Sequence, residues 1–172
     1  MLRRLHTMAL PGVLLLGGCL EADPSYNMIR ALRDMPLQAG SYQLCETPKK
    51  SCSDVTIRHG DAEMILRHKG DDYTIQMDAW GGGRKWITLV KAEGMAVFTF
   101  VDLHDDGAFH MQIPKCHSAL LEKVRGEQTE VHGGRCRVSG AFQAEQYIEG
   151  LLDYPTDQRF EPADMILRPQ AS

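Results

Sequence analysis

An alternation of apolar and polar residues between positions 41 and 113 constrains the fold of this chain more than any other feature. It is clearest in residues 73–80, Tyr-Thr-Ile-Gln-Met-Asp-Ala-Trp. Successive side chains of a β-strand point to opposite faces, so a period of two indicates strands that bury one face. Similar runs occupy residues 41–45, 54–57, 63–68, 85–91, 95–104 and 108–113. We therefore predict about seven strands.

Short turn signals separate these runs. A glycine occurs in each of the links at 69–71, 81–83, 92–94 and 105–107. Links this short join antiparallel neighbours, because a parallel pair needs a crossover connection of roughly a dozen residues or more. The predicted sheet is therefore an antiparallel β-meander, which can be curved or partly closed.

The rest of the chain predicts helices. Residues 28–35 carry apolar side chains at helical spacing and end before Pro36, which disfavours helical backbone in the residue before it. After Pro114 the pattern predicts helices at 115–126 and 141–152, with short strands at 136–138 and 165–167. We expect one α+β domain in residues 28–172, in which two C-terminal helices and a short N-terminal helix accompany the meander.

The first 19 residues have a different character. Arg3 and Arg4 precede an apolar stretch at 8–16, which is too short for a transmembrane helix and typical of a secretory signal. The stretch ends in Leu16-Gly17-Gly18-Cys19, which resembles the lipobox of bacterial lipoprotein signal peptides. The resemblance covers residues 1–19 only. It implies cleavage before Cys19, a diacylglycerol thioether on its sulfur, and an acyl chain such as palmitate on its amine.

The lipoprotein resemblance also implies an organisation and a location. Residues 1–18 would be the signal peptide and residues 19–27 a lipidated tether. Two or more acyl chains anchor a protein stably to a membrane. In the sorting rule known for enteric-type lipoproteins, Asp after the lipidated Cys retains the protein at the inner membrane. Leu20 stands there, so the rule implies an outer-membrane anchor and a domain that faces the periplasm.

The charge of the chain argues against nucleic acid as a partner. The formal net charge is -4, and removal of Arg3 and Arg4 with the signal peptide makes it -6. An acidic chain has no overall attraction for nucleic acid.

The cysteine count fits export. If Cys19 of the five cysteines carries lipid, Cys45, Cys52, Cys116 and Cys136 remain, and an oxidising compartment favours disulfides among them. Three pairings exist. Cys45 with Cys52 is the local choice, which leaves Cys116 with Cys136. Zinc ligation is disfavoured because the chain has no C-x-x-C spacing.

The segment from Trp80 to Trp86 is the best candidate for contact with a partner. Trp80, Arg84, Lys85 and Trp86 surround three glycines, and aromatic and cationic side chains on a flexible tip suit a protein, glycan or headgroup. The alternative is a hairpin whose tryptophans pack across the strands.

Asp102 and His104 are weak catalytic candidates. The segment 102–107 starts like an EF-hand loop but has His104 and Ile113 where that motif needs ligands, so we predict a hairpin turned by Asp106-Gly107. That turn would pair Asp102 with Met111 and His104 with Phe109. A carboxylate beside an imidazole can act as a base, but the sequence assigns no third partner.

No nucleophile, phosphate-binding, dinucleotide or metal motif stands out, so we predict no cofactor and no metal site. We expect a lipid-anchored binding module in the periplasm, of the inhibitor or immunity type, that binds an envelope-directed protein. One alternative is an envelope assembly or lipid-carrying lipoprotein. Another is a hydrolase with scattered catalytic residues, because catalytic triads are spatial rather than sequential.

Overall fold

A computed structural model describes residues 20–28, 36–47, 51–60, 63–80, 83–124, 130–132, 135–162 and 165–170. Within these residues the strands are β1 (Leu20–Ala22), β2 (Gly40–Glu46), β3 (Ser51–His59), β4 (Met64–His68), β5 (Asp71–Ala79), β6 (Lys85–Ala92), β7 (Met95–Leu103), β8 (Phe109–Gln112), β9 (Glu130–His132), β10 (Arg135–Arg137) and β11 (Met165–Pro169). The helices are α1 (Ser118–Leu121), α2 (Ala141–Leu151) and α3 (Thr156–Arg159).

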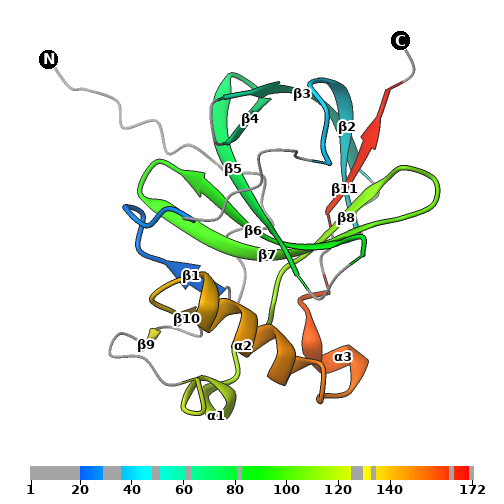
Figure 1. Cartoon of the computed structure of the whole chain (residues 1–172). Coiled ribbons are helices and arrows are strands. Elements are labelled where there is room, and N and C mark those ends of the chain that lie inside the picture. The colour runs from blue at the N-terminus through cyan, green and yellow to red at the C-terminus, as the bar shows by residue number, and fades with distance from the viewer. Residues whose placement is uncertain are drawn as a thin grey trace, which may run out of the picture.

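Eight of the described strands close into a barrel (Figure 1). Their order is β6-β5-β4-β3-β2-β11-β8-β7, and the pairing of β7 with β6 closes the circle. Neighbouring strands of the barrel are antiparallel. The α+β class and the antiparallel pairing are confirmed. The sheet differs from the predicted meander of about seven strands because it closes into an eight-stranded barrel and carries additional strands. Closure depends on β11, which enters between β2 and β8 although it is distant from both in sequence.

Strand β1 corrects the prediction of a tether at residues 19–27. Glu21 pairs with Val97 of β7 and, in parallel, with Arg137 of β10. Leu20 is 0% exposed. Three residues gave too short a pattern for the sequence to show a strand. The predicted helix at 28–35 lies outside the described residues apart from Met28, which is buried.

Two apolar cores lie on opposite faces of β6 and β7. The first fills the barrel and consists mainly of the inward side chains Tyr42, Leu44, Val55, Ile57, Met64, Leu66, Tyr73, Ile75, Met77, Trp86, Val97, Val101, Phe109, Met111, Met165 and Leu167. The second joins Ile87, Leu89, Phe98 and Phe100 on the outer face to α1, α2 and β1. In Figure 1 the helices lie below the barrel, on the side of β7.

Tyr147 fixes α2 to the chain that leaves the barrel. It is 0% exposed, its hydroxyl donates to the Lys115 carbonyl at 2.6 Å, and it accepts from the His117 amide at 2.6 Å. Burial, opposed by the hydrogen bond from His117, raises the pKa of Tyr147 to about 12. Helix α2 matches the predicted helix at 141–152. The predicted helix at 115–126 is reduced to α1, with 125–126 outside the described residues.

Both predicted disulfides are present. Cys45 and Cys52 face each other across β2 and β3. Cys116 and Cys136 join the segment after β8 to β10. The second disulfide links the barrel to the outer sheet extension beside Tyr147.

Candidate functional sites

The two tryptophans of the predicted contact segment do not form an exposed tip. Trp86 begins the inward row of β6, is 7% exposed and lies near Phe109 inside the barrel. Trp80 lies outside the barrel, half-buried, with its ring edge on Phe100 at a centroid distance of 5.1 Å. Strand alternation explains the split, because the two residues pack into different cores.

The two cations of that segment are exposed and lie beside the predicted acid–histidine pair. Lys85 pairs with Asp102 across β6 and β7, and Asp102 pairs with His110 across β7 and β8. Strand alternation places all three on the outer face, in line with the outward row of Ile87 and Leu89. Lys85, Asp102 and His110 therefore form one cross-strand row.

Arg84 ties the β5–β6 turn to the β7–β8 turn. Its guanidinium forms an ion pair with Asp105 at 2.5 Å and donates to the His104 carbonyl at 2.7 Å. The backbone adds a hydrogen bond from the Leu103 amide to the Arg84 carbonyl at 3.0 Å. The two hairpin tips are thus one connected surface.

The β7–β8 hairpin has a register different from the predicted one. Leu103 pairs with Phe109, and the His104 amide donates to the Ala108 carbonyl at 2.9 Å. The loop holds three residues with Gly107 at φ +79°, a geometry that shifts the register by one residue. The predicted pairing of Asp102 with Met111 and of His104 with Phe109 is therefore wrong.

Side-chain contacts order this loop. The Asp106 carboxylate accepts from the Ala108 amide at 3.0 Å. This hydrogen bond, followed by the charges of Arg168, His104 and His110, lowers the pKa of Asp106. The imidazoles of His104 and His110 stack with centroids 3.6 Å apart and planes 11° apart.

We call Arg84, Lys85, Asp102, His104, Asp105 and His110 the paired-hairpin surface. The sequence pointed to four of them but missed His110 and Asp105, whose roles follow from the loop register. Face-to-face imidazoles direct their nitrogens outward in parallel planes, not toward a common point. Within the described residues, no group of three or more His, Cys, Asp or Glu side chains is arranged to hold a metal ion.

A second polar cluster lies at the other end of the barrel. His68 ends the inward row of β4, is 3% exposed, and its Nε2 lies 2.8 Å from the Ser53 hydroxyl of β3. Strand alternation also turns Glu46 of β2 and Asp71 of β5 toward the interior. Burial and the charge of Lys69 lower the pKa of His68, whereas the charges of Glu46 and Asp71 oppose this.

His68 borders a small apolar cavity of about 50 Å³ inside the barrel. Its other lining residues are Leu44, Leu66, Tyr73, Ile75, Val90, Thr99, Met111 and Met165. A Ser–His contact is the pair that activates a serine nucleophile. It is also how a buried histidine satisfies its hydrogen-bonding groups.

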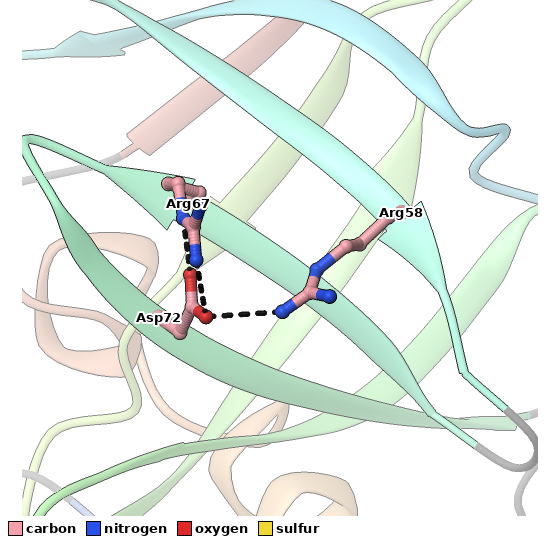
Figure 2. A network of polar contacts seen from close by, with 3 residues as sticks. All are labelled: Arg58, Arg67 and Asp72. Carbon is pink, nitrogen blue, oxygen red and sulfur yellow. Dashed lines mark hydrogen bonds and ion pairs between the residues drawn. The ribbon is translucent and has the colours of Figure 1, made fainter.

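A third polar cluster lies on the outer face of β3, β4 and β5. Asp72 of β5 lies between Arg67 of β4, at 2.7 Å, and Arg58 of β3, at 3.0 Å (Figure 2). Hydrogen bonding from Arg67 lowers the pKa of Asp72 despite partial desolvation. Arg58 on β3 and Arg67 on β4 stand four and three strands from β7 in the closed order. These two arginines therefore serve as a reference for the paired-hairpin surface.

Comparison of the chain with protein-family models, with curated proteins and with solved structures finds no match. Cys19 and the signal segment lie outside the described residues. In the part of the chain that is described, no helix has the length and apolarity to cross a membrane.

Proposed function

We propose that this chain is a lipid-anchored binding module of the bacterial envelope that contacts a protein partner through the paired-hairpin surface, as an inhibitor or immunity protein does. The observation that carries the proposal is the connection of Arg84 to Asp105 and His104, which holds charged, exposed groups of two hairpins in one arrangement. Arginine and aromatic side chains are enriched at protein interfaces. Half-buried Trp80 lies beside Phe100 at the base of this surface.

The anchor is proposed at Cys19, with residues 1–18 removed and the domain in the periplasm on the outer membrane. The disulfides Cys45–Cys52 and Cys116–Cys136 support an oxidising compartment. Cys19→Ser, or globomycin treatment, should block processing and release the protein from the membrane fraction. Normal processing and membrane retention of Cys19→Ser would reject the lipid anchor.

Charge reversal tests the partner surface. Envelopes of cells that express the native chain, solubilised in mild detergent, should contain it in a complex larger than the lipidated monomer. The double variant Arg84→Glu/Lys85→Glu should move most of the chain to the monomer position in size-exclusion chromatography, because like charges across an interface disfavour association. The matched control is Arg58→Glu/Arg67→Glu on the opposite wall. A wild-type monomer, or equal loss in both variants, would contradict the assigned surface.

Lipid carriage inside the barrel fits the geometry less well. Pockets for small molecules usually measure roughly 300–1,000 Å³, whereas the described cavity measures about 50 Å³ because side chains fill the barrel. An assembly role would use the same outer surfaces as the binding module.

A hydrolase is the second candidate, and the Ser53–His68 contact favours it. In such an enzyme the Ser53 hydroxyl would attack the carbonyl carbon of an ester while His68 takes its proton. The ester C–O bond would break and the alcohol would leave with that proton, and water would then hydrolyse the acyl-serine, whose acyl group would lie over the cavity. A fluorophosphonate probe would then label the wild-type protein and spare Ser53→Ala and His68→Gln. Absence of labelling in the folded wild type would reject this candidate.

A further inference from the structure

A polar groove of about 310 Å³ runs beside β1. It lies between the end of β1, the β6–β7 turn and β10, and its lining includes Glu21, Pro24, Glu93, Arg135 and Arg137. Its volume is several times that of the cavity inside the barrel and falls in the usual range for small-molecule sites. The groove is thus large enough for a small polar group.

Two guanidiniums in this groove share one carboxylate. Arg135 lies 2.9 Å from one oxygen of Glu21, and Arg137 lies 3.8 Å from the other. The Glu21 side chain is only 13% exposed, whereas those of Arg135 and Arg137 are 40% and 46% exposed. A guanidinium has five N–H donors in a fixed fork, so both arginines retain donors for a phosphate.

The groove adjoins the point where the predicted lipid anchor joins the domain. Leu20 is buried in β1 and pairs with Cys136, the residue after Arg135. Consecutive Cα atoms are about 3.8 Å apart, so a lipid on the residue before Leu20 is covalently held within a few ångströms of Leu20, at the start of β1. Because no flexible segment separates the lipid from β1, the groove beside β1 would lie at the level of the lipid headgroups.

The charges of the groove fit a headgroup that carries both signs. Arg135 and Arg137 are balanced by Glu21 and Glu93, so the groove has no net charge to attract an anionic surface. Phosphate suits the arginine fork. The ammonium of such a headgroup needs a carboxylate that no arginine already occupies. Glu93 meets this condition, because both arginines pair with Glu21.

We propose that this groove binds the headgroup of a zwitterionic membrane phospholipid, with its phosphate on Arg135 and Arg137 and its ammonium toward Glu93. The proposal rests on the lipid anchor proposed above. Headgroup binding in the groove would fix the orientation of the anchored domain relative to the bilayer.

Native mass spectrometry of the full, processed chain tests this proposal. The lipidated protein is reconstituted in vesicles of phosphatidylethanolamine and phosphatidylglycerol in equal amounts and is then released into the spectrometer. The wild type should retain one phosphatidylethanolamine in preference to phosphatidylglycerol. Arg135→Gln/Arg137→Gln should reduce this adduct about tenfold, because charge-assisted hydrogen bonds to phosphate are lost.

Two further variants keep the result interpretable. Glu93→Gln, at the exposed turn, should abolish the preference for phosphatidylethanolamine without unfolding the protein. Arg58→Gln/Arg67→Gln, on the opposite wall, should leave the adduct unchanged. An adduct that persists in Arg135→Gln/Arg137→Gln, or that shows no preference in the wild type, would overturn the headgroup site.

The same spectra separate this proposal from the anchor. The intact mass reports whether Cys19 carries acyl chains. A lipidated chain without a headgroup adduct would reject the groove alone, whereas an unlipidated chain would reject the anchor on which the groove proposal rests.

Discussion

At the scale of single residues, the sequence predicts where apolar side chains are buried but not the hydrogen-bond partners of buried polar side chains. The alternation correctly grouped Tyr73, Ile75 and Met77 on one buried face of β5. His68, Thr88 and Thr99 are polar residues at inward positions, and no pattern along the chain indicates their partners. Register supplies them: Thr88 is paired with Thr99 and bonded to it, and His68 reaches Ser53.

His68 should make stability depend on pH. Its pKa is lowered from 6.5 in the folded state, mainly by burial, so the unfolded chain takes up a proton first as the pH falls. The stabilising contribution is therefore complete well above pH 6.5 and is lost as the pH falls below it. Urea unfolding of the mature domain at pH 7.5 and 5.5 measures the loss.

The variant His68→Gln should show a smaller difference between these two pH values. His104→Gln, at an exposed position, leaves the surroundings of His68 intact and is the control. If His68→Gln keeps the full wild-type pH dependence, the buried imidazole is not its source.

Tyr147→Phe should destabilise the domain by about 1–3 kcal/mol, because the amide of His117 and the carbonyl of Lys115 lose their shared partner. Tyr154→Phe, at a half-buried position where the ring packs on His117, should cost less than about 0.5 kcal/mol. Chemical denaturation measures both. Equal effects of the two variants would mean that the hydroxyl of Tyr147 does not hold α2 in place.

At the scale of elements, the local sequence pattern predicted strands β2 to β8 and helix α2. The shortest elements and the closure of the barrel depend on contacts between distant segments. Strands β2 to β8 lie close to the predicted runs because each has a period-two pattern and short links. β1 and β9 have three residues each, and α3 has four, too few for a period to appear. The insertion of β11 between β2 and β8 joins segments more than 50 residues apart, which no local signal specifies.

Strand β1 gives a direct test of the absence of a tether. Leu20→Ala should destabilise the mature domain by about 2–5 kcal/mol, the usual cost of truncating a fully buried leucine. Leu152→Ala makes the same chemical change at a residue that is 37% exposed and should cost far less. Equal unfolding midpoints for the two variants would show that Leu20 belongs to a flexible tether, as the sequence suggested.

At the scale of the whole molecule, β7 separates two surfaces. The groove lies at its start, beside Met95 and Ala96, and the paired-hairpin surface lies at its end, beside Asp102. A strand rises about 3.3 Å per residue, so the two surfaces are about 20–23 Å apart along β7. If the groove faces the bilayer, the paired-hairpin surface points away from it, toward partners in the periplasm.

The sequence predicted this end of the molecule only in part. Arg84, Lys85, Asp102 and His104 were identified by residue type, but as two separate candidates. The four residues form one surface only because β6 pairs with β7 and because the loop after β7 has three residues. Trp86 was misassigned because side-chain direction is set by which face of β6 closes the barrel.

Site-specific photocrosslinking in living cells tests the central claim most directly. A photoreactive amino acid replaces Lys85 on β6 or, as a matched exposed cation on the opposite wall, Arg58 on β3. Ultraviolet light should then yield one discrete protein adduct from position 85, lost on Arg84→Glu, and none from position 58. Adducts of equal yield at both positions, or none at position 85 in a chain that is folded and anchored, would contradict the assignment of the paired-hairpin surface.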